Sequence, residues 1–496
     1  MMTLAQLLDG VGLKQPLPPL AQTVMVSGID YDSRRIRRGD VFFAFSGVNV
    51  DGRKFAAAAI AQGAVAIVGE LPPPPQDVEI GTLWIEVEHG RRALSLAVRN
   101  LFGDLTKQLQ VTGITGTNGK TTTSYLVDAI LQQQGRPTAL VGTIEYRLAG
   151  DVRPAPNTTP ESLDFYRLMR DLLAKDGSSL TAEISSHALA LGRVRGLTFH
   201  TAVLTNFTRD HLDFHNTMEA YFAAKCELFQ GQDAPAPRCA VLNRDDEWSA
   251  NVPLHADTCA YWYGLHANAN VRAQRVHEDF DGLHFTLNAP QATFEVRSKL
   301  VGRINVYNIL AACATGLSYG LGPAQITAGV AACEAVPGRF ERISAGQPFL
   351  VAVDYAHTDD ALRNTIAVAR AMRPKRVLTL FGCGGDRDRA KRPMMGKAAA
   401  EGSDLVVLTS DNPRSEDPLG IMNDVLVGLA RFDTPYLLEP DRRKAIQAIL
   451  ESAQPGDIVI LAGKGHETYQ IFRDQTIHFD DREVASDVLA QLGYSR

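Results

Sequence analysis

The chain has 496 residues, 45% of them hydrophobic and 21% charged, which is typical of a globular enzyme with more than one domain. A formal net charge of −6 gives no electrostatic reason to expect a polyanionic partner, so we expect no nucleic-acid binding. The six cysteines are scattered without a CxxC pair, which argues against a disulfide scaffold or a thiolate zinc site.

The N-terminal region shows no pattern of export or membrane insertion. The first ten residues lack a basic region, and Asp9 and Gly10 interrupt their short apolar run. The most apolar stretch, residues 56–68, is Ala-rich and predicts a helix, but Gln62 and Gly63 break it and it is too short for a membrane span. We therefore expect a cytoplasmic protein without membrane insertion.

Three segments follow one another along the chain, and we expect domains at 1–105, 106–335 and 336–496. The first combines short strands and turns with the Ala-rich helix. The second opens with a strand, a glycine-rich loop and a helix that begins near Gly119 and is closed by Gly135. The chain is therefore predicted to be α/β throughout, with a smaller first domain.

The third segment alternates apolar strands with helical stretches. Five strands are predicted, within residues 349–355, 376–382, 404–410, 435–440 and 457–463, and helices are predicted at 361–372 and 442–453. Strands separated by helices in this way indicate a parallel, doubly wound sheet with helices on both faces.

The loop after the first strand of the second segment has the composition of a phosphate-binding loop. Gly113, Gly116 and Gly119 allow backbone N–H groups to approach phosphates, Lys120 can reach the terminal phosphates, and the Thr121 hydroxyl can bind Mg²⁺. The standard spacing would place glycine at 114, where this chain has isoleucine. The competing interpretation is a glycine-rich turn without a ligand.

The form TGTNGKTT at 115–122 resembles the Mur ligase family, and further matches extend over the whole chain. They are NTT (157–159), EISSH (183–187), NFTRDHLDFH (206–215), GRINVYN (302–308), GRFE (338–341), DYAH (354–357), FGCGGDRDRAKRP (381–393), DNPR (411–414) and GKGHE (463–467). The resemblance is to the members that add meso-diaminopimelate to UDP-N-acetylmuramoyl-L-alanyl-D-glutamate in peptidoglycan synthesis.

This resemblance implies both a fold and a reaction. The implied fold has an N-terminal domain for the UDP-sugar substrate, a central P-loop ATP-binding domain and a C-terminal Rossmann-like domain for the amino acid. The implied reaction activates a carboxylate with ATP as an acyl phosphate, which an amine then attacks to form an amide. The implied enzyme is a monomer that uses ATP and Mg²⁺, since several negative charges must be neutralised in one site.

The resemblance also assigns the ATP, metal and catalytic residues. ATP contacts are expected from Gly116, Thr117, Asn118, Gly119, Lys120, Thr121, Thr122, Asn305, Arg339 and Asp354. The metal ligands are expected to be Thr121, Glu183, His211 and Lys225, and the catalytic residues Lys120, Lys225, His211 and His357. In the family the lysine at the place of Lys225 is carbamylated, and apolar neighbours here are expected to depress its pKa.

Each of these assignments has a plainer alternative. Glu183 can be a solvated acid, His211 a helix-cap residue, His357 a buried structural histidine, and Lys225 a lysine whose ammonium reaches solvent. For the UDP-linked substrate the resemblance points to Tyr31, Ser33, Asn49, Asn157, Thr158, Thr159, Ser185 and Arg193. The chain departs from the family pattern at Val48 and Val50, and at Leu191 where glutamine is common.

The amino-acid pocket is expected where loops follow the strands of the third segment. The residues assigned to it are Arg387, Asp411, Asn412, Pro413, Arg414, Gly463 and Glu467. Arginine suits the distal carboxylate of diaminopimelate, and Glu467 with Asn412 suits its ammonium. The alternative is an Asn-Pro turn with an exposed arginine.

Two other functions share parts of this pattern. Folylpoly-γ-glutamate synthesis uses the same loop and the same ATP-to-amide chemistry, but it does not explain DNPR or the first segment. A P-loop switch or nucleic-acid motor would have no amino-acid substrate, and the charge balance gives it no support.

Overall fold

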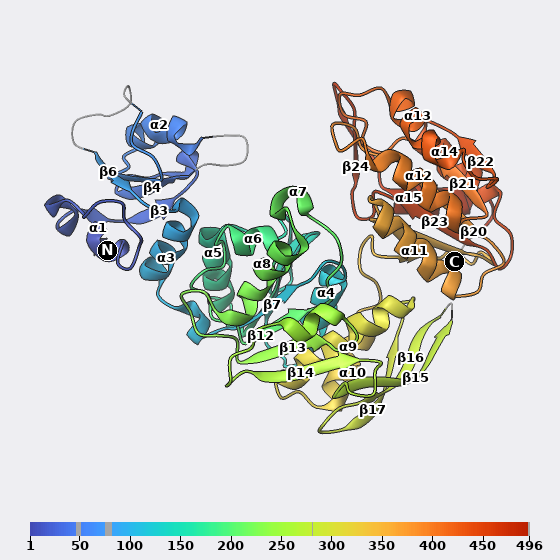
Figure 1. Ribbon diagram of the computed structural model, residues 1–496, viewed down its shortest axis with the longest axis horizontal. Helices are drawn as coiled ribbons and strands as arrows, with labels where there is room; N and C mark the ends of the chain where they lie inside the picture. The colour runs from blue at the N-terminus through green and yellow to red at the C-terminus, as the bar shows by residue number, and fades with distance from the viewer. Residues whose placement is uncertain (46–50, 75–81, 280, 495–496) are drawn as a thin grey trace. The chain divides into compact units, whose positions relative to one another are not determined.

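The computed structural model describes residues 1–45, 51–74, 82–279 and 281–494 (Figure 1). Contacts within the chain divide it into two compact units. The first contains Met1–Arg272 and Leu310–Gly329, and the second contains Ala273–Ile309 and Val330–Arg496. The division into three segments, with boundaries at 105 and 335, remains a prediction.

The N-terminal part of the first unit is built on a four-stranded parallel sheet. Its strands, in spatial order, are β3 (Gly28–Asp30), β4 (Asp40–Ala44), β5 (Ala66–Gly69) and β6 (Leu83–Glu86). The other elements here are β1 (Met2–Thr3), β2 (Met25–Val26), α1 (Leu4–Leu7), α2 (Ala56–Ala61) and α3 (Gly90–Phe102).

The Ala-rich helix predicted in the first segment is present, and it ends where Gln62 and Gly63 interrupt the apolar stretch 56–68. Helix α2 ends at Ala61, and Gly63 turns the chain with a φ of +100°. Ile67 and Val68 then continue as the buried strand β5, which suits their branched side chains. This strand was not predicted from the sequence.

The central sheet has a parallel core. In spatial order its strands are β10 (Asp151–Pro154), β9 (Glu145–Leu148), β8 (Thr138–Val141), β11 (Ser179–Glu183), β7 (Gln110–Thr115), β12 (Thr201–Leu204), β13 (Cys239–Asn243) and β14 (Cys259–Gly264), followed by β15 (Val271–Asp279), β16 (Gly282–Asn288) and β17 (Thr293–Ser298). Strands β8, β11, β7, β12, β13 and β14 are parallel. The loops after β7, β11 and β12 therefore emerge at one edge of the sheet, where α/β proteins bind ligands.

Helices flank this sheet, and the predicted helix after the glycine-rich loop is present. They are α4 (Lys120–Gln132), α5 (Ser162–Leu173), α6 (Ser186–Ala190), α7 (Leu212–His215), α8 (Met218–Gln230), α9 (Arg303–Ser318) and α10 (Pro323–Ala332). Gly135, which was predicted to close α4, has a φ of +75° three residues after its end. Ten of the thirteen residues of α4 are buried, so this helix is a core element and not a surface one.

The C-terminal sheet confirms all five predicted strands. Its order is β18 (Glu341–Ile343), β19 (Leu350–Asp354), β23 (Ile458–Ala462), β20 (Val377–Phe381), β21 (Leu405–Leu408) and β22 (Tyr436–Leu438). The five predicted strands are parallel, whereas β18, which the sequence did not reveal, joins the edge antiparallel to β19. A small hairpin of β24 (Tyr469–Ile471) and β25 (Thr476–His478) lies apart from this sheet.

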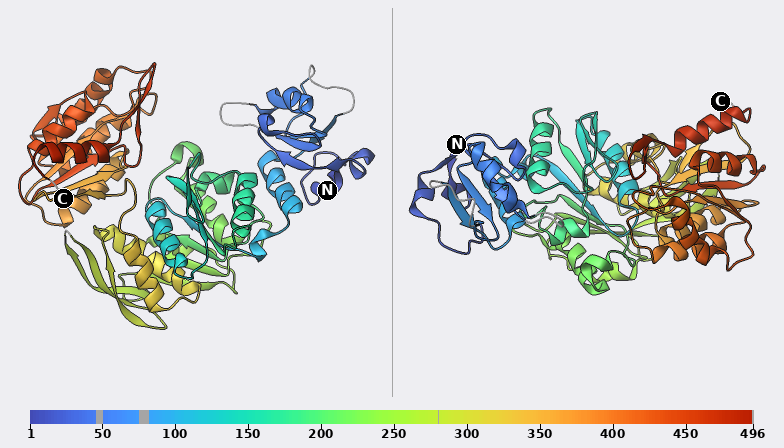
Figure 2. Two further views of the ribbon diagram at one scale, coloured as in Figure 1. Left: turned by 180° about the vertical axis from the view of Figure 1, so that it is seen from behind. Right: turned by 90° about the horizontal axis from the view of Figure 1, so that it is seen from above.

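Helices cover both faces of the C-terminal sheet, as predicted. One apolar cluster packs α11 (Asp359–Ala371), α12 (Lys391–Gly402) and α13 (Pro418–Leu429) against one face. A second cluster packs α14 (Arg442–Glu451) and α15 (Asp481–Gln491) against the other. Figure 2 shows this orange-to-red part from two sides, with helices around the strands.

All six cysteines are free thiols. Within the residues that the structure describes, no helix has the length and apolar character needed to cross a membrane.

Candidate active site

The glycine-rich loop lies between β7 and α4 and packs tightly against a neighbouring loop. Gly116 and Gly119 have φ values of +142° and +83°, which favour glycine. A Cβ atom on Gly116 would lie 1.8 Å from Oγ1 of Thr205, so no side chain fits there. Thr121 and Thr122 follow on α4 and are buried.

The segment 205–208, after β12, holds this loop in place. The Asn206 amide is bonded twice to Asn118: its Oδ1 accepts from the Asn118 backbone N–H at 2.9 Å, and its Nδ2 donates to the Asn118 carbonyl at 3.0 Å. The Thr117 hydroxyl donates to the Thr208 carbonyl at 3.1 Å. Two of the family motifs thus meet here, and Asn206 fixes the loop although the sequence assigned it no role.

Two ammonium groups converge on one carbonyl of the loop. Nζ of Lys120 lies 3.0 Å from the Gly116 oxygen, and Nζ of Lys225, on α8, lies 2.8 Å from the same oxygen. Lys225 is only 2% exposed, and its ammonium lies 4.5 Å from the ring centre of Tyr221. Burial, and then repulsion from Lys120, place the pKa of Lys225 well below the ordinary lysine value. The expectation from its apolar neighbours is met, and the exposed-lysine alternative is not.

A buried carboxylate lies beside the start of α4. Glu183, at the end of β11, is fully buried, so it is not a solvated acid. Its Oε2 accepts from the Thr121 hydroxyl at 3.1 Å and from the Thr143 hydroxyl at 3.0 Å, and its Oε1 accepts from the Thr143 N–H at 2.9 Å. One carboxylate and two hydroxyls form a set of hard oxygen donors, which fits Mg²⁺. Thr143 was not predicted from the sequence.

His211 lies at the start of α7 and belongs to a group of aromatic rings. Its ring centre is 4.8 Å from that of His187 and 5.9 Å from that of Tyr221. It precedes the helix in a left-handed conformation, with a φ of +50°, but its side chain makes no cap hydrogen bond. Burial lowers the pKa of His211, and the neighbouring Asp210 carboxylate opposes this shift. A neutral imidazole ring can bind a metal. Among the described residues, no three His, Cys, Asp or Glu side chains form a metal-binding cluster by themselves.

The residues predicted to contact the UDP-linked substrate after β9 are close to this carboxylate. The Thr158 hydroxyl is 3.1 Å from that of Thr143. The Thr159 hydroxyl donates to the Glu183 carbonyl at 2.8 Å and accepts from the Ser185 N–H at 3.0 Å. Arg193 donates to the Thr159 carbonyl at 3.0 Å and pairs with Glu161, also at 3.0 Å.

Several of these side chains already have protein partners. Ser185 caps α6 by accepting from the Ala188 N–H. Asn157 is exposed, and its backbone carbonyl accepts from the Tyr146 hydroxyl at 2.6 Å. Asn49, with Val48 and Val50, lies outside the described residues. The structure therefore brings Thr158, Thr159, Ser185 and Arg193 together near Glu183.

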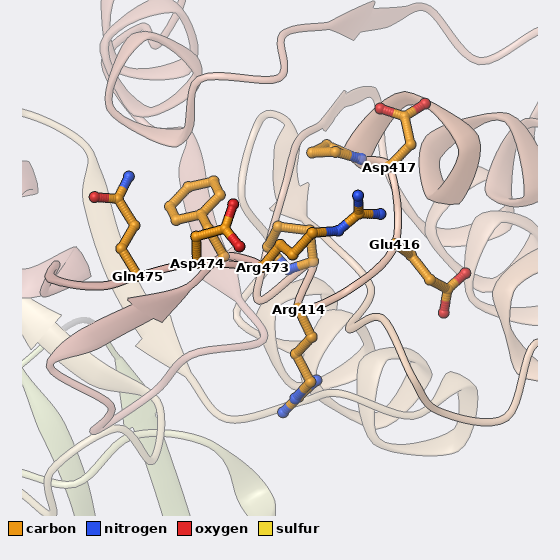
Figure 3. Close-up of a pocket in the computed structure, with 9 residues that line it drawn as sticks. Arg414, Glu416, Asp417, Arg473, Asp474 and Gln475 are labelled. Atoms are coloured by element: carbon orange, nitrogen blue, oxygen red, sulfur yellow. The ribbon is translucent and has the colours of Figure 1, made fainter.

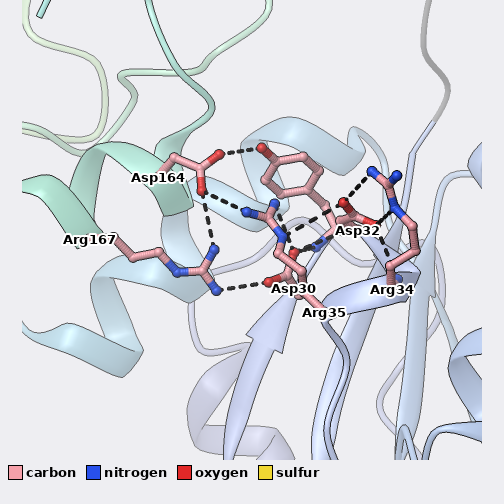
Figure 4. A network of polar contacts seen from close by, with 7 residues as sticks. Asp30, Asp32, Arg34, Arg35, Asp164 and Arg167 are labelled. Carbon is pink, nitrogen blue, oxygen red and sulfur yellow. Dashed lines mark hydrogen bonds and ion pairs between the residues drawn. The ribbon is translucent and has the colours of Figure 1, made fainter. Parts of the chain in front are cut away.

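Tyr31 lies in a network of charged side chains that joins residues 30–35 to α5 (Figure 4). The Tyr31 hydroxyl donates to Asp164 of α5. The buried Asp30 pairs with Arg167 at 2.8 Å and with Arg35 at 3.3 Å. Ser33 is buried at the start of a short 3₁₀ helix. Residues 133 or more positions apart in the chain thus hold the 30–35 segment in place.

In the second unit, the residues predicted to contact ATP have mainly internal partners. The amide of Asn305 donates to the Val301 carbonyl at 2.7 Å and accepts from Asn308 at 2.8 Å. Asp354, at the end of β19, accepts from the backbone N–H groups of Phe340 and Ala356 at 2.8 and 3.0 Å. Burial raises the pKa of Asp354.

Arg339 and His357 lie close to the aromatic ring that follows Asp354. The Arg339 guanidinium is 5.1 Å from the ring centre of Tyr355. His357 is exposed, and its Nδ1 is 2.8 Å from the Tyr355 carbonyl, so it is not a buried structural histidine.

The loops after β21 and β23 bring together Asp411, Asn412 and Glu467. Asn412 is buried, and its Nδ2 donates to Oε2 of Glu467 at 2.9 Å. Lys464, which the sequence assigned no role, is fully buried and donates to Oδ1 of Asn412 at 3.1 Å. Its Nζ is also 3.4 Å from Asp411 and 3.6 Å from Glu467. Gly463, with a φ of +111°, lets the chain turn directly before this lysine.

Arg414 and Arg387 differ in how firmly they are held. Arg414 has a φ of +53°, and its Nη1 donates to the Gly385 carbonyl at 2.9 Å. Arg387 is exposed and makes only a 3.4 Å contact with the Asp386 carbonyl in the described part of the chain. Pro413 and Arg414 line a pocket of about 460 Å³ together with the β24–β25 turn. Figure 3 shows the Arg414 guanidinium pointing away from Arg473, another lining residue.

Comparison with known sequences identifies the family. The descriptions that match are "Mur ligase family, catalytic domain" over residues 25–101, "Mur ligase middle domain" over 114–316 and "Mur ligase, glutamate ligase domain" over 338–465. The UDP-N-acetylmuramoyl-L-alanyl-D-glutamate--2,6-diaminopimelate ligase of Solibacter usitatus is 60% identical over 494 residues, 99% of each chain. The chain belongs to the Mur ligase family. A ligase of the same name from Geobacter metallireducens is 43% identical over 486 residues, 94% of each chain.

Solved structures agree with the Mur ligase assignment. A UDP-N-acetylmuramoyl-L-alanyl-D-glutamate--2,6-diaminopimelate ligase has a TM-score of 0.71 and 32% identity, and the match covers all of both chains. The folylpolyglutamate synthase of Mycobacterium tuberculosis shares the fold, with a TM-score of 0.58, but only 17% identity over 81% of this chain and 95% of its own. This Mur ligase is therefore an ATP-dependent enzyme that forms amide bonds, with the three-domain α/β fold of its family.

The sites of this Mur ligase are thus assembled around residues that the motifs marked and a few that they did not. Thr159, Ser185 and Arg193 lie near Glu183, and Asn412 meets Glu467 after β21 and β23, whereas Arg387 is exposed. Asn206, Thr143 and Lys464 complete the same sites. Asn206 and Lys464 lie within the motifs at 206–215 and 463–467, whereas Thr143 lies in none of the marked motifs.

Proposed function

We propose that this Mur ligase joins meso-diaminopimelate to UDP-N-acetylmuramoyl-L-alanyl-D-glutamate, at the expense of ATP, in cytoplasmic peptidoglycan synthesis. The observation that carries the proposal is the pairing of Asn412 with Glu467 beside Arg414, in a chain 60% identical to a ligase of that name. Diaminopimelate has an ammonium and a carboxylate at its distal end, so a carboxylate and a guanidinium in adjacent loops complement it. Six free thiols and the use of ATP support a reducing cytoplasmic setting.

The phosphate loop supplies the groups that would bind the ATP phosphates and offset their negative charge. ATP phosphates would lie against the loop backbone and the Lys120 ammonium, which now donates to the carbonyls of Gly116 and Thr117. The substrate carboxylate takes up the γ-phosphoryl group to give an acyl phosphate and ADP. The diaminopimelate amine then attacks the acyl carbon, and phosphate leaves as the amide forms. Lys120 offsets charge that develops on the transferred phosphoryl group.

The oxygen cluster at Glu183 fits Mg²⁺ by its donor chemistry. The Glu183 carboxylate and the Thr121 hydroxyl would hold the ion, with His211 completing the set of protein ligands. When bound, Mg²⁺ neutralises phosphate charge. Thr143 orients the Glu183 carboxylate through two hydrogen bonds.

We assign Lys225 a carbamate in the active enzyme, as in the family. Its amine adds to CO₂ and loses a proton, which replaces an ammonium by an anionic oxygen ligand for a second Mg²⁺. The burial of this amine supports the assignment, because a neutral amine is the form that reacts with CO₂.

The remaining substrate contacts complete the proposal. The UDP-linked dipeptide would be held by Tyr31, Ser33, Asn49, Asn157, Thr158, Thr159, Ser185 and Arg193. The nucleotide would also contact Gly116, Thr117, Asn118, Gly119, Thr122, Asn305, Arg339 and Asp354, with His357 near the phosphates. The amino acid would be held by Arg387, Asp411, Asn412, Pro413, Arg414, Gly463 and Glu467. We propose that one monomer carries a complete site.

A product analysis tests this function directly. The protein is mixed with ATP, Mg²⁺ and the UDP-linked dipeptide, and separate reactions receive diaminopimelate, lysine or glutamate. Mass spectrometry should detect one added diaminopimelate residue and release of ADP and phosphate. Preferred addition of lysine or glutamate, or ATP hydrolysis without any amide product, would disprove the proposal. A reaction without Mg²⁺ is the matched control and should give no product.

A further inference from the structure

Lys464 is the centre of the polar cluster after β23. The side chain is fully buried, and its Nζ donates to the Tyr469 carbonyl at 2.7 Å and to Oδ1 of Asn412 at 3.1 Å. The same Nζ lies 3.4 Å from Asp411 and 3.6 Å from Glu467. One ammonium therefore contacts two carboxylates, an amide and a backbone carbonyl. Two hydrogen bonds and two ion pairs engage this ammonium within the protein, so it is poorly placed to bind a ligand itself.

The contact with Asn412 fixes which way that amide points. Oδ1 of Asn412 accepts from Lys464 and from the Ile471 N–H at 3.0 Å. Its Nδ2 must then face Glu467, to which it donates at 2.9 Å. A flipped amide would set its donor group against two other donors. Lys464 thus orients Asn412, and Asn412 in turn holds one carboxylate oxygen of Glu467.

The charges around Glu467 also depend on Lys464. Burial and the neighbouring Asp411 raise the pKa of Glu467, whereas Lys464 and the Asn412 amide lower it. The other groups facing it are Tyr355 and Tyr469, together with Arg442. Asp411, Glu467 and Lys464 together carry a single net negative charge when all are ionised. One ligand ammonium would neutralise that charge.

We propose that Lys464 is a positioning residue for amino-acid selection, which holds Asn412 and keeps Glu467 in the ionised form that binds the distal ammonium. This inference rests on the proposed function and adds a residue that acts only through others. Removing the ammonium leaves the buried Asp411 and the half-buried Glu467 without a shared cation, and protonating one relieves their repulsion. Glu467 would then lose the charge that attracts the ligand.

Two substitutions separate the charge from the hydrogen bond. Lys464→Met removes both, whereas Lys464→Gln removes the charge but keeps an N–H donor for Asn412. Lys444→Gln is the matched control, because Lys444 is an exposed lysine of the same unit on α14. Far-UV circular dichroism and thermal melting show whether each variant folds.

Steady-state titrations of all three substrates test the inference. For both Lys464 variants we expect KM for diaminopimelate to rise by about 10-fold or more, as for loss of one charged hydrogen-bonding partner. KM for ATP and for the UDP-linked dipeptide should stay within about twofold, and Lys444→Gln should match wild type. Equal changes in all three KM values, or no change in any, would overturn the inference.

The pH dependence of kcat/KM for diaminopimelate adds a second measurement, which a general loss of packing would not shift along the pH axis. Binding needs ionised Glu467, so kcat/KM for diaminopimelate should rise with pH through its pKa. Loss of Lys464 raises that pKa. In both variants, therefore, the rise of kcat/KM on the acidic side of the pH profile should move to higher pH. An unchanged position of this rise contradicts the proposal.

A double substitution keeps the idea testable if Lys464→Met folds poorly. In a Glu467→Gln background the charge on Glu467 is already absent, so adding Lys464→Gln should change KM for diaminopimelate by less than about twofold. A full additive loss would mean that Lys464 acts independently of Glu467. If wild type forms no product with diaminopimelate, the proposed function fails, and the inference with it. If wild type does form it and the variants behave like wild type, only the inference fails.

Discussion

Two buried lysines of the described structure have very different surroundings. Lys225 in the first unit contacts the Gly116 carbonyl and the ring of Tyr221, and in the described part of the chain it forms no ion pair with a carboxylate. Lys464 in the second unit lies within 3.6 Å of both Asp411 and Glu467. Burial lowers the pKa of the first well below the ordinary value. The second is surrounded by negative charge.

The difference indicates two uses of one side chain. An amine without an anionic partner is easily neutral and can form a new covalent bond. An ammonium between carboxylates is a fixed charge that orients its neighbours. The amine of Lys225 at the phosphate loop therefore stays available for a covalent change. The group of Asp411, Glu467 and Lys464 largely balances its own charges, and its one remaining negative charge can attract the ammonium of an amino acid.

Replacing Lys225 should give the largest effect and tests one side of this comparison. We expect Lys225→Ala to lower kcat by about 10³-fold or more, because both a ligand and its charge are lost. A short carboxylic acid added to the assay should restore part of the activity by supplying the missing oxygens. The same acid should not rescue a Lys464 variant. Full activity of Lys225→Ala, or an unmodified ammonium in a complex with nucleotide and both metal ions, would contradict the carbamate.

Lys120→Ala should come next, with a loss in turnover of at least about 10²-fold, typical of one electrostatic donor in a transition state. The loop backbone is unchanged, so thermal melting should match wild type. Single-turnover assays with saturating ATP measure the effect. Near-normal turnover would remove the phosphate loop from the mechanism.

Arg414→Ala should be comparable in size but confined to one substrate. Leaving the distal carboxylate unpaired costs about 2–5 kcal/mol, so kcat/KM for diaminopimelate should fall by about 10²-fold. The weak use of lysine should change much less, and KM for ATP should be nearly constant. Paired titrations with both amino acids measure this. Equal losses for the two would show that Arg414 acts on their common end.

Tyr31→Phe should have the smallest effect and probes the charged network of the N-terminal part. The ring and its stacking on Phe45 remain, so only the hydroxyl contact to Asp164 is lost. One hydrogen bond contributes about 0.5–1.5 kcal/mol, so KM for the UDP-linked dipeptide should rise by up to about tenfold. Asp164→Asn also weakens the ion pairs of Asp164 with Arg35 and Arg167, so KM should rise at least as much in that variant. An unchanged KM in both would remove this network from substrate binding.

The local pattern of the sequence predicted the elements well. Helix α4 and the strands of the C-terminal sheet follow from apolar periodicity and flanking glycines. Strand β18 has only three half-buried residues and was not recognised. Strand β5 in the stretch 56–68 was also not recognised, because its pairing with β4 and β6 depends on residues distant in the sequence.

The contacts that the site residues make within the protein could not be predicted from the local sequence pattern. Lys464 stands between two glycines and the sequence assigned it no role, because its contact with Asn412 joins loops 52 residues apart. The amides of Asn305 and Asn412 are satisfied within the protein, which no motif indicates. Arg387 and Arg414 carry the same side chain in neighbouring motifs, yet one is exposed and the other is held by the Gly385 carbonyl.

The close approach of Gly116 to Thr205 has a genetic consequence. Every missense change of a glycine codon adds at least a Cβ atom, and here that atom would lie 1.8 Å from a hydroxyl oxygen. The backbone at Gly116 also has a φ that side chains rarely adopt. A missense change at this codon therefore requires Thr205 to move and strains the backbone. We expect changes at this codon to be mostly synonymous, so resistance to an inhibitor that contacts this glycine should arise more readily elsewhere in the gene.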